Sequence, residues 1–331
     1  MENTQQELGI LGFFGILKQS FKIIFYHKKL FTQFSLAFLI PITIIFQVKM
    51  FTAVLFSFNM FKNRAEPEDI TVFVIPQYSS LNFNLMASFK WTVYWFLSEI
   101  GYLILLLIFS ILSTISIAHT IGSIYTSREV NFSKATALIP TIWKRVLITF
   151  LLIFAITSVY DYLLGPVLGL ILRLLFFKKF TVVKLVVGII LTILYIAVFV
   201  YITIIWRLAS VISVMESNTS GMKAIIKSRN LIKGKMAAAV GLFIVVLTFS
   251  AGVDTLFMLL VVYGPIIPLR IGIGILSFIL KLLTILLLYV VQTVIYFVCK
   301  SYHNEDIEEE YYVADDDQKA MDVQLVTLLL D

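Results

Sequence analysis

Long runs of apolar residues dominate the chain, and short segments that carry most of the polar and charged positions separate them. A helix that crosses a bilayer needs about 20 mainly apolar residues, each adding about 1.5 Å. In lipid the backbone must satisfy its own hydrogen bonds, so such runs predict helices. Six segments are long enough, at residues 31–57, 92–120, 146–172, 182–206, 237–263 and 271–298. The third contains Gly165-Pro166, where we expect a kink or an early exit of the helix.

Composition supports the same fold class. Of 331 residues, 60% are hydrophobic and 14% are charged, and the mean hydropathy is +0.97. Soluble domains have roughly 45–50% apolar and about 25% charged residues, so a water-soluble fold could not cover this much apolar surface. We therefore predict an all-α polytopic membrane bundle of about six spans. The single cysteine, Cys299, excludes an internal disulfide and a cysteine-based metal cluster, and we expect no metal site and no cofactor.

The distribution of basic residues predicts the orientation. The net charge is +6, but Lys and Arg lie in short segments between apolar runs, which is typical of membrane proteins and argues against a nucleic-acid partner. With the N-terminus inside, the inner segments hold roughly twice as many Lys and Arg as the outer ones. This count includes Arg207, which follows the fourth apolar run. Both termini are therefore predicted to be cytosolic, with the sequons at Asn131 and Asn218 in cytosolic loops.

A basic segment with helical character precedes each odd-numbered span, at residues 17–31, 133–147 and 222–236. The simplest interpretation is three copies of one unit, an amphipathic interfacial helix followed by a transmembrane hairpin, with Gly234 ending the third helix. Chance coincidence among lysine-rich loops is the alternative. When the segments are stacked, two sets of lysines align and are candidates to face anionic headgroups: Lys18, Lys134 and Lys223, then Lys28, Lys144 and Lys233.

This organisation divides the chain into three parts. Residues 1–29 are predicted to be a cytosolic N-terminus with an amphipathic interfacial helix, and residues 30–299 a six-span domain. Residues 300–331 are acidic and carry too little apolar surface to fold alone, so we expect a disordered cytosolic tail.

Two stretches carry a family resemblance. Trp206-Arg-Leu-Ala-Ser-Val-Ile-Ser-Val-Met-Glu216 is followed by Gly221-Met-Lys-Ala-Ile-Ile-Lys-Ser-Arg-Asn-Leu-Ile-Lys-Gly-Lys235. This pattern resembles that of uncharacterised plant six-span membrane proteins. It is distantly similar to the membrane domain attached to some bacterial glycerophosphodiester phosphodiesterases. The resemblance implies a multipass protein of an endomembrane or the plasma membrane with no established activity. It does not imply phosphodiesterase activity, because the catalytic barrel of those enzymes is a separate soluble domain.

Ionisable residues within predicted spans are the candidate site residues, because they are costly in lipid and usually mark partners or function. Asp254 and Lys281 lie at matching depths of one hairpin, about 15 Å below its outer end, and so do Lys49 and Glu99 in another. We expect two ion pairs, which either lock neighbouring helices or form part of an ion relay. Asp161 has no obvious charged mate and is the candidate pathway residue if a polar solute is carried. The alternative, which is favoured, is that it hydrogen-bonds Ser and Thr side chains of neighbouring helices.

Three function classes follow. A non-enzymatic membrane organiser or adaptor, acting on the bilayer or on partner proteins through amphipathic helices, is favoured. A transporter or channel for a small polar solute or ion is the first alternative, motivated by Asp161, Asp254 and the Gly-Pro pairs. A lipid-handling enzyme is the second, although no phosphate-cradling loop, metalloprotease motif or nucleophile elbow occurs.

Overall fold

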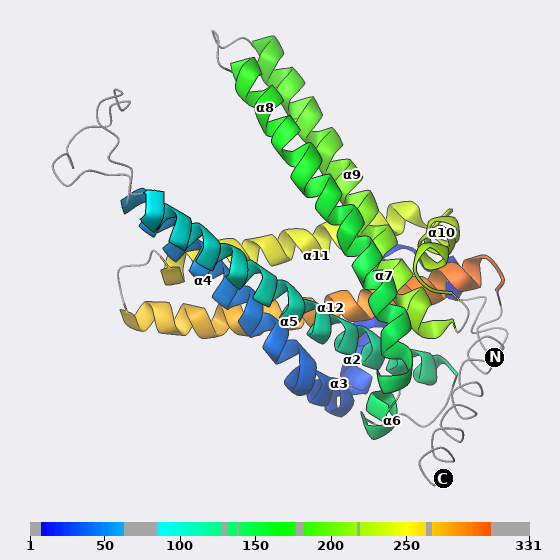
Figure 1. Cartoon of the computed structure of the whole chain (residues 1–331). Coiled ribbons are helices and arrows are strands. Elements are labelled where there is room, and N and C mark those ends of the chain that lie inside the picture. Colours follow the sequence, from blue (N-terminus) through cyan, green and yellow to red (C-terminus); the bar gives the residue numbers. More distant parts are fainter. Residues whose placement is uncertain are drawn as a thin grey trace, which may run out of the picture.

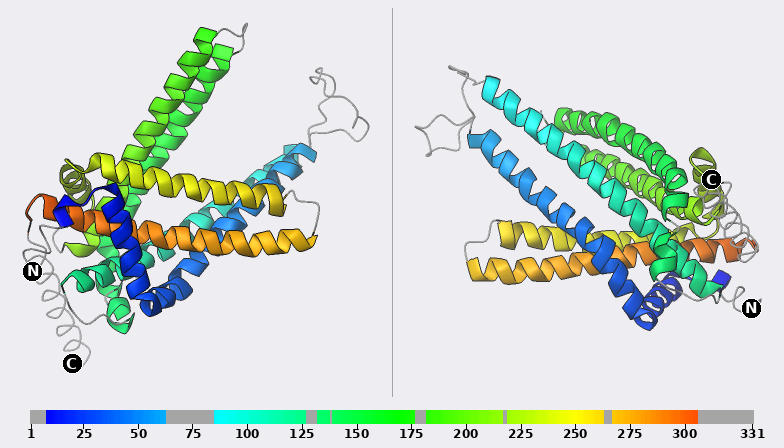
Figure 2. Two further views of the ribbon diagram at one scale, coloured as in Figure 1. Left: turned by 180° about the vertical axis from the view of Figure 1, so that it is seen from behind. Right: turned by 60° about the horizontal axis from the view of Figure 1, so that its bottom comes forward.

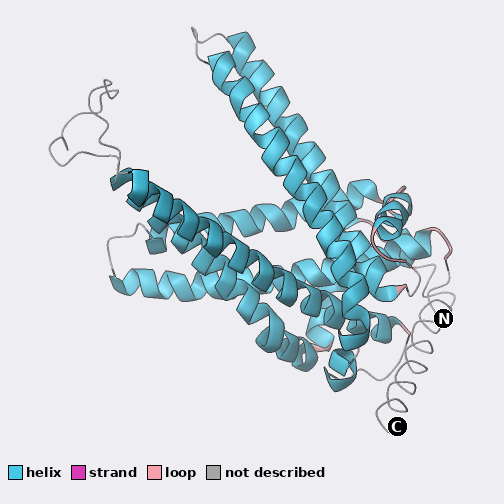
Figure 3. Ribbon diagram, viewed as in Figure 1, coloured by secondary structure: helices cyan, strands magenta, loops and turns pink. Residues whose placement is uncertain are grey.

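The computed structural model describes residues 8–62, 85–126, 132–137, 139–176, 182–216, 219–262 and 267–305. Every regular element within these residues is a helix, and short turns connect them (Figure 3). Six helical stretches are long and apolar enough to cross a membrane, which confirms the predicted all-α fold. They are Lys28–Val54, Thr92–Tyr125, Ile142–Leu175, Val182–Met215, Met236–Val262 and Ile267–Tyr302.

The six long stretches form three hairpins, and shorter helices precede each of them. The first hairpin pairs α4 (Ile40–Lys62) with α5 (Leu85–Tyr125), after α2 (Phe13–Tyr26) and α3 (Lys28–Phe34). The second pairs α7 (Ile139–Val159) and α8 (Gly165–Phe176) with α9 (Val182–Met215), after α6 (Phe132–Ala137). The third pairs α11 (Met236–Phe257) with α12 (Ile267–Tyr302), after α10 (Met222–Leu231).

The short helices α2, α3, α6 and α10 gather at one end of the molecule, which we call the base (Figure 1). The described chain also begins and ends there, since Gly9 packs against Ser301. The three hairpins diverge from the base (Figure 2).

Buried side chains are concentrated where the hairpins meet, in their base-side halves. Every residue of α9 from Leu208 to Met215 is buried, as is every residue of α12 from Tyr289 to Ser301. The far halves instead leave apolar side chains uncovered by protein, such as Ile193 at 60% exposure and Leu276 at 51%. Lipid is the solvent that suits such surfaces.

Two prolines within the spans are accommodated by π-helical turns rather than by breaks. Such turns occupy Ser35–Leu39 and Tyr160–Leu164, and each ends two residues before a proline, Pro41 or Pro166. Proline lacks an N–H, and its ring collides with the carbonyl four residues earlier, so a locally wider turn relieves the clash. Helix α8 therefore continues to Phe176, and the third span does not exit early at Gly165-Pro166.

The three predicted interfacial segments have different fates. Residues 222–236 contain α10 and a turn, much as expected. Residues 17–31 are divided at His27, between α2 and α3. Residues 133–147 include most of α6 and the first part of α7, which starts at Ile139, and residue 138 between them lies outside the described residues. Residues 306–331, most of the predicted acidic tail, lie outside the described residues, as do Asn131 and Asn218.

Gly234 was predicted to end the third interfacial helix, but α10 ends earlier, at Leu231, and Gly234 lies within the turn of residues 232–235 that follows. Its φ of +90° favours glycine, and a Cβ there would overlap the ring of Tyr302. We expect Gly234→Ala to lower the free energy of unfolding by about 1–2 kcal/mol. The midpoint of unfolding of the purified protein in lipid nanodiscs measures this loss.

Gly252→Ala is the matched control. Gly252 lies within α11, where a Cβ meets nothing within 4 Å, so alanine should stabilise the helix by about 0.5–1 kcal/mol. If both variants shifted stability in the same direction, the strained turn at Gly234 would be contradicted.

Candidate functional site

A cavity of about 770 Å³ lies between the three hairpins. Helices α4, α5, α7, α9, α11 and α12 all contribute to its lining, so every hairpin supplies part of the wall. This volume is within the range of small-molecule sites, about 300–1,000 Å³. The cavity is therefore the first candidate for a functional site.

The walls of the cavity are mainly apolar, and one side is open. Ile104 of α5 is 54% exposed and Leu151 of α7 is 49% exposed, although both line the cavity. Ile100 and Phe154, one on each of the same helices, are also exposed lining residues. From these exposures we infer an opening beside α5 and α7, along surfaces that lipid covers in a membrane. Phe46 of α4, 38% exposed, also lines the cavity.

Polar side chains form the base-side end of the cavity. Arg207 of α9 donates from Nη1 to Oε1 of Gln292 on α12, at 3.2 Å. Tyr289, one turn away on α12, and Ser110 of α5 also line the cavity. Arg207 and Gln292 lie about 12–15 Å from the base ends of their helices, counted along the helix axes.

The sequence interpretation placed Arg207 in a loop after the fourth span, and the structure corrects this. Helix α9 continues to Met215, so the guanidinium projects from within a membrane-spanning stretch. A charged side chain is tolerated there because it faces the bundle interior rather than lipid. The sequence alone does not identify Gln292 as a candidate site residue, because a single amide in an apolar run is not distinctive until its contact with Arg207 is known.

The expected contact between Asp254 and Lys281 is present in the wall of the cavity. Lys281 Nζ lies 2.8 Å from Oδ1 and 2.7 Å from Oδ2 of Asp254, and it also donates to Ser250 Oγ at 2.8 Å. The Phe46 ring centroid is 5.3 Å from the same Nζ. Lys281 is 6% exposed, so this pair is held well inside the bundle.

Lys49 and Glu99 also meet, but away from the cavity. Lys49 Nζ lies 2.9 Å from Glu99 Oε2, and the side chains are 36% and 22% exposed. The pair joins α4 to α5 within the first hairpin, and neither residue lines the cavity. Its geometry suits a link between two helices.

Asp161 lies on an exposed face of the second hairpin and does not line the cavity. Tyr195 of α9 donates its hydroxyl to Asp161 Oδ1 at 3.4 Å, so Asp161 contacts a neighbouring side chain through a hydrogen bond rather than an ion pair. Tyr160 donates to the backbone oxygen of Tyr195 at 2.7 Å, and the two rings stack. These contacts make Asp161 part of a local link between η2 and α9.

A second cluster, at the base, surrounds the buried carboxylate of Glu216. Glu216 follows α9, is 1% exposed, and lies 2.8 Å from Lys227 Nζ of α10. The hydroxyl of Tyr296 donates to it at 3.3 Å. Arg145 of α7 donates to the carbonyl oxygens of Ser213 and Val214 at the end of α9, at 2.8 and 3.2 Å. The cluster joins the second hairpin to α10 and to the third hairpin.

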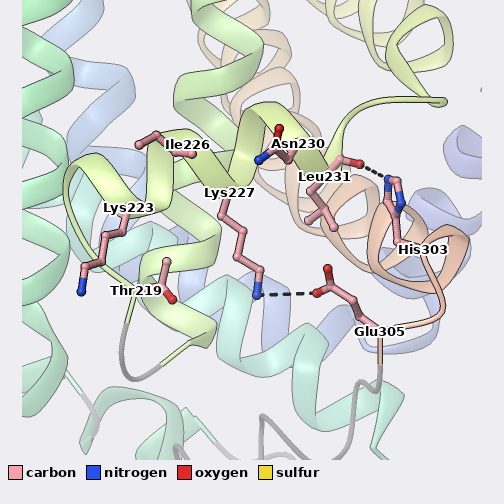
Figure 4. Close-up of a pocket in the computed structure, with 8 residues that line it drawn as sticks. All are labelled: Thr219, Lys223, Ile226, Lys227, Asn230, Leu231, His303 and Glu305. Carbon is pink, nitrogen blue, oxygen red and sulfur yellow. Dashed lines mark hydrogen bonds and ion pairs between the residues drawn. The ribbon is translucent and has the colours of Figure 1, made fainter.

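A shallow pocket of about 560 Å³ lies beside this cluster, between α10 and the end of α12 (Figure 4). Lys227 points toward Glu305 across it, with Nζ and Oε2 3.6 Å apart. His303 Nε2 lies 3.0 Å from the carbonyl oxygen of Leu231. These contacts attach α10 to the base end of α12.

The lysines predicted to face headgroups are exposed wherever their side chains are described. They lie on or near the helices of the base, except that Lys144 is in the first turns of α7. The exposed ones are Lys18, Lys28, Lys144, Lys223 and Lys233, and the Lys134 side chain lies outside the described residues. Lys233 also donates to Asn230 Oδ1 at 3.0 Å.

Comparison with known proteins identifies a family but no characterised relative. Searches of curated proteins and of solved structures gave no match. One family model matches residues 1–320, which include the cavity, the base cluster and all six candidate spans. The chain belongs to the family of this model, which is described as a domain of unknown function (DUF8558).

Proposed function

We propose that the protein is a non-enzymatic multipass membrane protein that binds an amphiphile of the bilayer in the cavity between its hairpins. The arrangement of the cavity carries this proposal. Its walls are apolar and open between α5 and α7, whereas its polar groups are gathered at the base-side end and around Lys281. A molecule with a tail and a polar head can enter sideways from lipid and satisfy both kinds of surface.

The same arrangement argues against a pathway for a small hydrated solute. Such a path needs polar groups along its whole length to replace water. Asp161, the predicted pathway residue, lies elsewhere. A serine–lysine nucleophile is also disfavoured, because Lys281 donates to Asp254 as well as to Ser250 and acts as a donor in this geometry.

The base is proposed to face the cytosol. The excess of basic residues on that side supports this orientation, and the exposed lysines of α2 and α10 are then positioned to contact anionic headgroups. Lys18 and Lys28 would do so at one side of the base, and Lys223 and Lys233 at another. The resemblance to plant six-span proteins is compatible with such a role, since it implies no enzymatic activity.

Blocking the opening of the cavity tests the proposal. We expect Ile104→Trp to lower the amount of lipid that stays bound to the purified protein by about tenfold, because the indole fills the gap between α5 and α7. Bound lipid is measured by native mass spectrometry after the protein is transferred from a lipid mixture into detergent.

Ile193→Trp is the matched control. Ile193 is 60% exposed on the far half of α9 and does not line the cavity, so this variant should retain lipid like the unmodified protein. Loss of lipid from both variants, or from neither, would show that the cavity is not the binding site.

A further inference from the structure

We propose that Arg207 and Gln292 form a binding site for the anionic headgroup, a carboxylate or a phosphate, of the amphiphile that occupies the cavity. The inference rests on the proposed function and specifies which class of amphiphile is bound. Unsatisfied hydrogen-bond donors, an uncompensated charge and the apolar walls support it in turn.

The first observation is a set of buried donors without acceptors. Gln292 is 2% exposed and lines the cavity, yet its Nε2 has no hydrogen-bond partner among the residues that the structure describes. Arg207 Nε is likewise buried without one. An arginine can only donate, so its contact with Gln292 fixes the amide oxygen on the Arg207 side and leaves the NH₂ group for another molecule. Buried donors left unmet are costly, and only an acceptor satisfies them.

The second observation is the charge at this end of the cavity. Asp254 is the acidic residue among those that line it, and Lys281 occupies both of its oxygens. Lys281 and Gln292 are about 16 Å apart along α12. Arg207 makes no ion pair within the part of the chain that the structure describes, so the cavity carries one uncompensated positive charge. A bound anion would neutralise it, and a guanidinium suits the geometry of carboxylate and phosphate.

The third observation is the shape of the space beyond these donors. From the base-side end the cavity continues past Leu107 and Leu103 of α5 to the opening beside Ile104. A free inorganic anion would leave these apolar walls uncovered. An alkyl tail would cover them and reach lipid through the opening.

Gln292→Glu is the sharpest test, because it is isosteric and supplies Arg207 with a permanent carboxylate partner. The probes are hexadecyl phosphate, palmitate, hexadecanol and inorganic phosphate, each titrated into the delipidated full-length protein, with binding read from the shift in unfolding midpoint. In the unmodified protein we expect the two anionic amphiphiles to bind at least about tenfold more tightly than hexadecanol.

In Gln292→Glu we expect hexadecyl phosphate and palmitate to bind about as tightly as hexadecanol. The ligand-free variant should be at least as stable as the unmodified protein. Arg207→Met should lose the preference for the anionic amphiphiles, and Ile193→Trp should keep it.

Equal binding of hexadecanol and the anionic amphiphiles to the unmodified protein would overturn the headgroup site and leave the proposed function standing. Binding of none of the three amphiphiles would overturn both. Binding of inorganic phosphate as tight as that of hexadecyl phosphate would show that the site takes free anions and overturn the amphiphile assignment.

Discussion

Glu216→Gln is expected to lower the free energy of unfolding by about 1–3 kcal/mol. The substitution keeps the size of the side chain but removes its charge, and Lys227 then loses the carboxylate that lies 2.8 Å from its Nζ. Arg145, which interacts electrostatically with the same carboxylate, loses that compensation too. Because Glu216 is 1% exposed, water cannot replace it. Reversible unfolding in mixed micelles, followed by tryptophan fluorescence, measures the loss.

Glu305→Gln provides the control at the same lysine. Glu305 lies 3.6 Å from Lys227 and its side chain is 39% exposed, so solvent screens the pair and the change should cost less than about 1 kcal/mol. We therefore expect Glu216→Gln to lower the free energy of unfolding several-fold more than Glu305→Gln does. Similar losses from both would mean that burial of Glu216 does not govern the stability of the base.

The six spans could be predicted from sequence because lipid leaves the backbone little choice. A long apolar run must pair its own N–H and C=O groups, so length and hydropathy were enough to place the helix ends to within a few residues, except that α9 continues nine residues past its predicted end, to Met215. The contact between Asp254 and Lys281 followed from the same regularity. Once two runs form one hairpin, the rise per residue fixes the depth of each side chain.

The polar end of the cavity could not be predicted in this way. Arg207 and Gln292 are 85 residues apart and belong to different hairpins, so their contact depends on how the hairpins pack at the base. Hydropathy also placed Arg207 outside the fourth span, because that run already had enough apolar residues. The small and apolar residues from Leu208 to Met215 were the available signal that α9 continues.

Glu216 illustrates the same difficulty at the base. Near the end of an apolar run, an isolated glutamate is normally solvated, and the sequence does not show that Tyr296 covers it from another hairpin. The interfacial helix predicted at residues 133–147 meets a related difficulty. Basic residues near a span do not reveal whether the helix lies on the membrane or continues into it, and here α7 starts at Ile139.

Substitutions in the ion pair of Asp254 and Lys281 are expected to cause the second large loss of stability. Asp254→Asn should lower the free energy of unfolding by about 3 kcal/mol, the order of cost of an unpaired lysine inside a bilayer. The reason is that Lys281 is 6% exposed and lies too deep in α12 to reach water. Lys281→Met alone should cost less, since the Asp254 side chain is 35% exposed. Unfolding in mixed micelles measures both single variants and the double variant.

The double variant decides whether the two residues act as partners. With both charges removed, no unpaired ion remains in the bundle, so Asp254→Asn/Lys281→Met should be more stable than Asp254→Asn alone, with a coupling energy of about 1–3 kcal/mol. Lys49→Met/Glu99→Gln is the matched cycle in the first hairpin. It should show a smaller coupling, because those side chains are 36% and 22% exposed. If the Asp254→Asn/Lys281→Met double variant were no more stable than either of its single variants, the contact would contribute nothing to the fold, and the charges would have to be retained for another reason.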